Sequence, residues 1–253
     1  MLAQERQQQI LALLEERGTV RTIDLAEEFQ VTDETIRRDL QQLSDHGQLT
    51  RIHGGASSLS GRPKLQSFSE RRSINVEKKR AIALAAIEWI KPGRTYAFDS
   101  STTVFELVTS LPDLPYRVVT NAYAVIDHLI GYQQTELIST GGRYHPKTHT
   151  FVGGDSFQSL RHHNISCAFV SSIGLDPNRG AAEGFEEQAL FKENLVLMAE
   201  EVILLIDSSK LLRRSEYFFA GIHQLTRVIT DRGADPEVVR KLTAAGCEVT
   251  VAD

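Results

Sequence analysis

Between residues 95 and 251, short apolar stretches alternate with segments of helical periodicity, and this alternation constrains the fold more than any other feature. The stretches have the length of strands, and the segments between them have the apolar spacing of helices. Such alternation is typical of a mostly parallel sheet covered by helices on both faces, so we predict an α/β domain. The predicted strands are 95–98, 117–119, 135–138, 168–170, 202–206, 228–229 and 249–251. The predicted helices include 104–111, 122–130, 188–199 and 236–245.

Small, hydroxylic or charged residues follow five of the predicted strands. In parallel α/β sheets, ligands bind beyond the carboxyl ends of the strands, so these residues should meet at one rim. After the first strand, an aspartate and four hydroxyl residues open a helix, where backbone N–H groups and the helix dipole favour an anion. The same residue types also cap helices without any ligand, which is the alternative for each segment alone. Together they predict a site for a hydroxyl-rich, anionic small molecule. The candidates are Asp99, Ser100, Ser101, Thr102, Thr103, Asn121, Gly142, Lys192 and Lys210.

The first sixty residues have a different pattern, with three short helices and then a hairpin. Apolar residues recur at helical spacing in 4–17, and Thr22 and Thr32 can cap two further helices separated by a short turn. Two strand-like segments, 49–53 and 56–59, flank a pair of glycines that suits a tight turn. Helix, helix, helix and hairpin is the order of a winged helix-turn-helix, so we predict that fold here.

The third predicted helix has one apolar face and one polar face. On a helical wheel Arg38 lies nearly opposite Ile36, so the helix can bury one side and present arginine, threonine and glutamine outward. Such side chains bond base edges and phosphates in a major groove, although an ordinary surface helix also carries arginines. The candidate DNA contacts are Thr32, Thr35, Arg37, Arg38 and Gln42 in the helix and Arg51 and His53 in the hairpin.

Charge is distributed unevenly, although the chain as a whole has a net charge of only −5. Residues 1–50 hold five arginines against ten acidic residues, whereas 51–94 hold ten basic residues against three acidic ones. A basic stretch after the recognition helix suits phosphate contacts, and a solvated linker and helix face are the alternative. Lys78, Lys79 and Arg80 are expected to face solvent, with DNA or a subunit partner as the other possibility.

The domain boundaries follow from the change in pattern. The segment 59–75 contains Gly61-Arg62-Pro63, several serines and little periodicity, and a helical pattern begins at Val76. We therefore predict a DNA-binding domain over 1–58, a linker over 59–75 and a ligand-binding α/β domain over 76–253.

Residues 31–40, Val-Thr-Asp-Glu-Thr-Ile-Arg-Arg-Asp-Leu, followed by Gly47 and by the Arg-Ile-His-Gly-Gly-Ala of 51–56, closely resemble the DeoR family of sugar-metabolism regulators. The resemblance extends through the second half in five segments and covers nearly the whole chain. It implies that the second domain senses a phosphorylated sugar and has a fold resembling sugar-phosphate isomerases. It also implies that Thr35, Arg37, Arg38, Arg51 and His53 touch DNA. The matching second-half residues are Asp99, Thr102, Thr103, Thr120, Asn121, Gly141, Gly142, Lys192 and 207–210.

The chain departs from the family at Ser101, where a glycine is usual. A Cβ there restricts close backbone approach, so the hydroxyl could substitute for a backbone contact with the phosphate. This serine-rich variant is similar to the fucose-operon activator branch of the family, which makes activation an alternative to repression.

The partners expected are double-stranded operator DNA, a small phosphorylated sugar and further copies of the chain, as a dimer or tetramer. Paired DNA-binding domains are expected because specific sites commonly mirror protein symmetry. No cofactor or metal site is predicted, and Cys167 and Cys247 are expected to be reduced, buried thiols. No leader and no long apolar run is visible, so we expect a cytoplasmic protein without membrane insertion.

Catalysis is the alternative function, since the resemblance includes sugar-phosphate isomerases. An isomerase needs a general base near the reacting carbons. Spacing pairs none of the available carboxylates with a substrate proton, and a DNA-reading domain has no use in such an enzyme, so we predict a regulator and not an enzyme. The residues considered as a base are Asp99, Glu183, Glu186, Asp207, His145 and His149.

Overall fold

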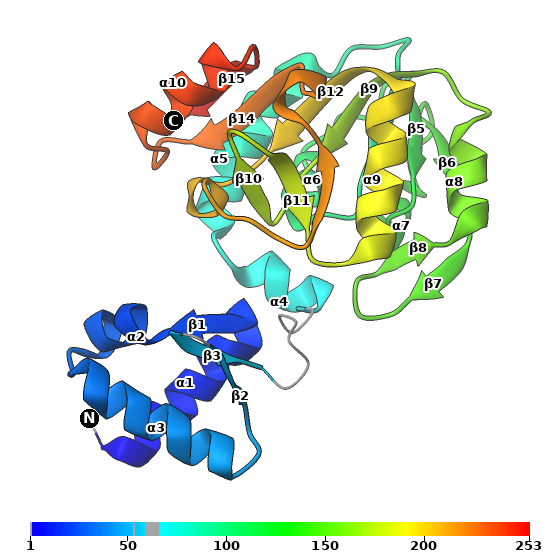
Figure 1. Ribbon diagram of the computed structural model, residues 1–253. Coiled ribbons are helices and arrows are strands. Elements are labelled where there is room, and N and C mark those ends of the chain that lie inside the picture. Colours follow the sequence, from blue (N-terminus) through cyan, green and yellow to red (C-terminus); the bar gives the residue numbers. More distant parts are fainter. Residues whose placement is uncertain (1, 53, 59–65) are drawn as a thin grey trace. The chain divides into compact units, whose positions relative to one another are not determined.

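The computed structural model describes residues 2–52, 54–58 and 66–253, which form two compact units (Figure 1). Unit 1 is Met1–Gln66 and unit 2 is Ser67–Asp253. The predicted linker, 59–75, is too long at its end, because Phe68–Ser73 forms helix α4 of unit 2. The Ser67 hydroxyl accepts the Glu70 N–H, and the Glu70 carboxylate accepts the Ser67 N–H, a capping box that starts a helix too short to show periodicity.

Unit 1 contains the three predicted helices and the predicted hairpin, and it adds a third strand. Strand β1 pairs with β3 and β3 with β2, all antiparallel, so the sheet order is β1-β3-β2. Gly55 is required in β3, because a Cβ would lie 2.0 Å from the Val20 carbonyl oxygen of β1. The prediction that Thr22 caps α2 is wrong, because Thr22 lies inside the helix and is buried. The elements are α1 Ala3–Arg17, β1 Thr19–Arg21, α2 Thr22–Phe29, α3 Asp33–Asp45, β2 Thr50–Ile52 and β3 Gly55–Ser57.

Unit 2 is built on a seven-stranded, fully parallel sheet, and each of its strands overlaps one of the seven predicted stretches. The order is β15-β14-β12-β9-β4-β5-β6. The sheet strands are β4 Thr95–Phe98, β5 Arg117–Thr120, β6 Glu136–Ser139, β9 Ile165–Val170, β12 Ala199–Leu205, β14 Arg227–Asp231 and β15 Glu248–Ala252. The helices are α4, α5 Val76–Ala86, α6 Thr102–Val108, α7 Tyr123–Leu129, α8 Gly154–Leu160, α9 Glu186–Met198 and α10 Pro236–Ala244.

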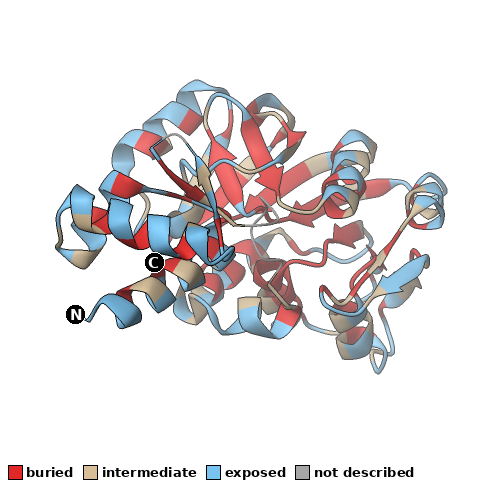
Figure 2. Cartoon of the chain, turned by 60° about the horizontal axis from the view of Figure 1, so that its bottom comes forward, coloured by how far each residue is buried: buried red, intermediate tan, exposed pale blue. Residues whose placement is uncertain are grey.

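Alternate residues of the central strands pack on opposite faces of this sheet. In β12, Val202 and Leu204 join the core beneath α9 and α10, whereas Ile203 and Leu205 join the core beneath α5, α6 and α7. Figure 2 shows buried residues running along the strands, with the exposed residues on the outer helices. The predicted arrangement of a parallel sheet with helices on both faces is confirmed.

The small antiparallel elements of unit 2 were not predicted. Strands β10, β11 and β13 form a three-stranded sheet, and β7 pairs with β8 in a hairpin. Each has only three or four residues, too few for alternation to be recognised. Their bounds are β7 Arg143–His145, β8 Thr150–Val152, β10 Gly174–Asp176, β11 Gly180–Glu183 and β13 Tyr217–Ala220.

The strand order places a topological switch point between β4 and β9. From β4 the chain proceeds through β5 and β6 to one edge, and from β9 it proceeds through β12 and β14 to the other edge. A crevice forms outside the carboxyl ends of the two strands at such a point, because the connections run away in opposite directions. Residues 99–103 and 171–172 follow these two strands directly. Among the described helices, none combines the length and the apolar character needed to span a membrane.

Candidate nucleic-acid interface and ligand site

Helix α3 presents the polar face that its sequence predicts. Ile36 and Leu40 are fully buried, whereas Arg37 and Arg38 are exposed, Arg38 nearly opposite Ile36 and Arg37 beside the buried face. The Thr32 side chain caps the helix by accepting the Thr35 N–H at 3.3 Å. The cap and the apolar face together hold two arginines outward on a rigid helix, which is a geometry suited to a DNA groove.

Two further candidates in unit 1 have partners within the protein. The Gln42 side-chain oxygen accepts a hydrogen bond from Gln7 at 2.6 Å, although Gln42 is exposed. Arg51, in β2, donates to the Arg37 carbonyl oxygen at 3.4 Å, which ties the hairpin to α3. His53 lies outside the described residues.

A buried ion pair behind α3 was not found by the sequence analysis. Arg6 Nε of α1 lies 2.5 Å from Asp39 Oδ2 of α3, and both side chains are less than 9% exposed. Gln7 also donates to Asp39 Oδ1 at 3.2 Å. The two residues of the ion pair are 33 positions apart, so local pattern could not pair them.

At the switch point of unit 2, the Asp99 carboxylate joins β4 to β9. Its Oδ1 accepts the Ser101 N–H and its Oδ2 accepts the Ser171 N–H, each at 2.9 Å. The Ser101 hydroxyl accepts the Val104 N–H at 3.2 Å and so caps α6. Ser101 has an extended backbone with φ −78°, a conformation open to any residue, so serine replaces the usual glycine without strain.

Lys192, which was predicted as a candidate for binding the ligand, is buried. Its Nζ contacts Asp99 Oδ2 at 3.1 Å, the Ser171 carbonyl oxygen at 2.6 Å and a carboxylate oxygen of Glu183. Burial alone would lower the pKa of Lys192, but the two carboxylates outweigh burial and raise it. An ammonium group has three protons, and each of these has an acceptor here.

Several buried polar atoms around the switch point have no hydrogen-bond partner among the described residues. They are Thr103 Oγ1 of α6, Asn121 Oδ1 after β5, and the hydroxyls of Ser171 and Ser172 after β9. Native proteins satisfy most of their buried polar groups, so a cluster of unpaired ones indicates a place for a polar ligand or ordered water.

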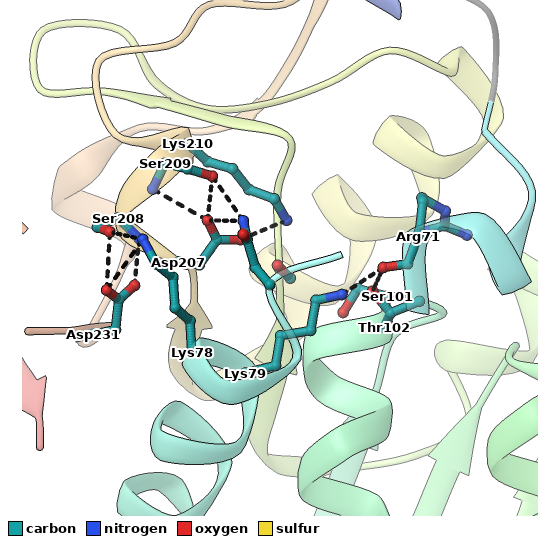
Figure 3. Close-up of polar contacts among 12 residues, drawn as sticks. Arg71, Lys78, Lys79, Ser101, Thr102, Asp207, Ser208, Ser209, Lys210 and Asp231 are labelled. Atoms are coloured by element: carbon teal, nitrogen blue, oxygen red, sulfur yellow. Dashed lines mark hydrogen bonds and ion pairs between the residues drawn. The ribbon is translucent and has the colours of Figure 1, made fainter. Parts of the chain in front are cut away.

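Four basic residues lie at the carboxyl edge of the parallel sheet (Figure 3): Arg71 of α4, Lys78 and Lys79 of α5, and Lys210 after β12. Of these, the sequence analysis had named only Lys210 as a candidate for binding the ligand. Lys79 was expected in solvent, but it is buried, and its Nζ donates to the Arg71 carbonyl oxygen at 2.5 Å. Burial, assisted by the nearby Lys210, lowers the pKa of Lys79 to about 8. Lys78 donates to the Ser208 hydroxyl at 2.7 Å and lies 3.5 Å from Asp231. The sequence offers no local signal that distinguishes Lys78 and Lys79 from surface lysines, because apolar and polar residues are not clearly separated on two faces of α5.

The loop after β12 carries Lys210 on the 3-10 helix Ser208–Lys210. Lys210 Nζ lies 3.5 Å from Asp207 Oδ2, and burial lowers the pKa of Lys210 although Asp207 raises it. Asp207 Oδ1 accepts from the Asn75 amide at 3.1 Å, so the loop is connected to the start of α5. Figure 3 shows Lys210 directed toward Asp207.

The remaining candidates are distributed around the same edge or have other contacts. Ser100 accepts a hydrogen bond from the buried Gln188 of α9 at 3.3 Å. The Thr102 hydroxyl donates to the Arg71 carbonyl oxygen at 3.5 Å. Gly142 is exposed with φ +110°, and a Cβ there would lie 2.7 Å from the Val152 carbonyl oxygen.

The carboxylates considered as isomerase bases are occupied by other contacts. Asp99 and Glu183 pair with Lys192, and Asp207 pairs with Lys210. Glu186 is exposed in the first turn of α9. Through these ion pairs the three carboxylates hold the ends of β4, β11 and β12.

Comparison with known proteins gives matches along nearly the whole chain. Residues 6–62 match the DeoR-like helix-turn-helix domain, and residues 74–232 match the DeoR C terminal sensor domain. The chain is 36% identical to the uncharacterized HTH-type transcriptional regulator YulB of Bacillus subtilis, over 99% of this chain and 97% of that protein. It is 33% identical to the L-fucose operon activator of Haemophilus influenzae, over 90% of this chain and 91% of that protein. Among solved structures, ribose 5-phosphate isomerase A of Methanocaldococcus jannaschii matches with a TM-score of 0.41 and 15% identity, over 54% of this chain and 55% of that chain.

Proposed function

The chain belongs to the DeoR family of DNA-binding transcription regulators, and from this premise we propose which residues read the operator and which class of molecule controls it. Unit 1 reads DNA with α3 in the major groove and the β2–β3 hairpin beside the backbone. Unit 2 binds a phosphorylated sugar at the carboxyl edge of its sheet. The protein acts in the cytoplasm as a dimer or tetramer, so that paired α3 helices meet the two halves of one operator.

For DNA binding, the proposal is supported by the exposure of Arg37 and Arg38 on a helix whose other face is fully buried. Arginine donates in parallel to two acceptors of a guanine or a phosphate. Unit 1 has an acidic balance overall, so binding rests on few cations. Removal of one cation should therefore have a large effect.

Arg38→Ala is expected to weaken operator binding by roughly tenfold to a hundredfold, because a good bidentate contact contributes about 1–3 kcal/mol. The measurement is a gel shift or fluorescence anisotropy titration on the cognate promoter at fixed salt. Arg17→Ala is the matched control, since Arg17 is an exposed arginine of unit 1 that pairs with Glu28 away from α3. Equal operator affinity in Arg38→Ala and the unmodified protein would contradict the role given to α3.

For the ligand, the observation that carries the proposal is the group of unpaired buried polar atoms at the switch point. Hydroxyl and amide groups of this kind suit the hydroxyls of a sugar, and the surrounding cations suit a phosphate. The site proposed comprises the candidates of the sequence analysis that line this edge. A relative named L-fucose operon activator supports a sugar-derived effector. The ligand would shift the protein between two arrangements that differ in operator affinity, with repression and activation both compatible.

Phosphorylated sugars are expected to raise the melting temperature of the full chain, whereas the same sugars without phosphate should leave it unchanged, because ligands of the native state stabilise it. Lys210→Ala should weaken the binding of the phosphorylated sugar roughly tenfold or more. It should leave the affinity for the operator unaltered when no sugar is present. Lys241→Ala, which changes an exposed lysine of α10, is the control. Following the same mixtures by NMR should show no conversion of the sugar; turnover at an enzyme-like rate would instead favour the isomerase alternative.

A further inference from the structure

The cations at the carboxyl edge of unit 2 differ in whether they have donors left for a ligand. Lys192 has none, since its three protons are taken by Asp99, Glu183 and the Ser171 carbonyl. Lys79 donates to a backbone carbonyl, and Lys210 has one long ion pair with Asp207. Lys192, one of the two lysines that match the family pattern, therefore supports the strand ends.

Arg71 of α4, unlike Lys192, has donors that no acceptor among the described residues takes. Its Nε and Nη2 atoms are both buried, and neither has a hydrogen-bond partner among the described residues. Burial lowers the pKa of Arg71, although the charges of Glu183 and Asp99 raise it. A buried guanidinium N–H without an acceptor destabilises the folded state, so these two donors call for an acceptor that the described part of the chain does not supply.

The two unpaired donors are arranged for one particular kind of acceptor. Nε–H and Nη2–H lie on the same edge of the planar guanidinium and point in parallel. Two oxygens of one phosphate or carboxylate can accept both protons at once, which a single lysine cannot achieve.

The backbone of Arg71 is held by the site itself. Its carbonyl oxygen accepts from Lys79 Nζ of α5 at 2.5 Å and from the Thr102 hydroxyl of α6 at 3.5 Å. Figure 3 shows Lys79 and Thr102 directed toward this carbonyl. The end of α4 is thereby fixed to the first turn of α6, beside the Asp99 loop, so the guanidinium is positioned by the residues that form the rim.

We propose that Arg71 binds the anionic group of the effector through Nε and Nη2, and that α4 is the helix through which effector binding reaches the DNA-binding unit. This rests on the proposed function, since it assigns a residue and a route to the same ligand site. Unit 1 ends at Gln66 and α4 begins at Phe68, so α4 is the first helix of unit 2 after the DNA-binding unit in the sequence. A ligand bound to Arg71 would therefore contact the helix that follows the DNA-binding unit directly in the sequence, and could favour one arrangement of that connection over another.

The test compares Arg71→Met with Arg72→Met in the full chain. Arg72 is the matched control because it lies on the same helix, is exposed, and places its guanidinium 5.0 Å from the Phe105 ring centre. The probe is inorganic phosphate, titrated against sodium chloride of equal ionic strength, with thermal shift and calorimetry as readouts. Phosphate should raise the melting temperature of the unmodified chain and of Arg72→Met, and should bind Arg71→Met at least roughly tenfold more weakly.

A second readout separates ligand binding from a structural role. Without phosphate, Arg71→Met should melt about 2–6 °C higher than the unmodified chain, because two buried donors without acceptors among the described residues are replaced by an apolar side chain. A residue required only for structure would lower the melting temperature when replaced. Equal phosphate affinity in the unmodified chain and Arg71→Met would overturn the assignment of Arg71 while leaving the proposed function standing. If neither phosphate nor any phosphorylated sugar bound the unmodified chain, both would fail.

Discussion

Asp39→Ala is expected to destabilise unit 1 by about 3–5 kcal/mol and to abolish operator binding. The substitution leaves Arg6 buried without its carboxylate, and an uncompensated buried charge is among the most destabilising changes known in proteins. Unit 1 is small and has a small core, so a loss of this size approaches its whole stability. Chemical denaturation followed by circular dichroism should show an early transition for unit 1, with unit 2 unfolding at an unchanged denaturant concentration.

Two comparisons make this result specific to the buried ion pair. Asp45→Ala removes an exposed aspartate of the same helix, which accepts from Gln41 at 2.8 Å, and should change stability by no more than about 0.5 kcal/mol. The double substitution Arg6→Met with Asp39→Leu should recover most of the stability, since a buried ion pair can be replaced by packed apolar side chains. If Asp39→Ala unfolds no earlier than Asp45→Ala, the ion pair does not anchor α3.

Lys192→Met should have an effect of similar size in unit 2. It leaves Asp99 and Glu183 buried without their shared cation, so we expect a loss of about 3–5 kcal/mol and an earlier unfolding transition for unit 2 alone. The measurement is denaturant unfolding followed by fluorescence of Trp89, which lies in unit 2. Lys241→Met, at an exposed position of α10, is the control and should unfold with the unmodified chain.

The pH dependence of this loss provides a further check. Burial acts to lower the pKa of Lys192, but Asp99 and Glu183 raise it above the ordinary value of 10.5. A raised lysine pKa means that the stabilisation is complete below the unfolded value and is lost as the pH rises through the folded value. The stability difference between the unmodified chain and Lys192→Met should therefore stay constant from pH 7 to pH 9 and shrink above pH 10.5. A difference that shrinks already between pH 7 and pH 9 would contradict the raised pKa.

The large elements could be predicted because their signals are local. The central strands of the parallel sheet, such as β4 and β9, are short apolar stretches that contribute to the cores on both faces, and their apolar character is visible without knowing their neighbours. The cap at Thr32 and the opposition of Ile36 and Arg38 follow from helical geometry alone. The elements that were missed, such as β1, α4 and the β7–β8 hairpin, have only three to six residues, too few for a period to be counted.

The candidate ligand site stays a prediction, and the structure shows only where its residues lie and what they contact. The rule that ligands lie beyond parallel strand ends led to residues 99–103 and to Lys210, all of which lie at the switch-point edge of unit 2. Residue type alone could not say which polar groups would be used internally. Lys192 and Arg71 are both basic residues on helices, yet Lys192 has three acceptors and Arg71 has two buried donors with none among the described residues.

The amino-acid sequence by itself determined the class of both units, the family and the outward face of α3, because each depends on periodicity and motif spacing over neighbouring residues. Only the tertiary structure decided that Asp39 meets Arg6, that Lys79 is buried, and that Arg71 is the guanidinium at the rim with unpaired donors. The reason is physical. The charge state and hydrogen bonding of a side chain depend on which distant residues share its low-dielectric surroundings, and chain folding brings those residues together from positions that no local pattern connects.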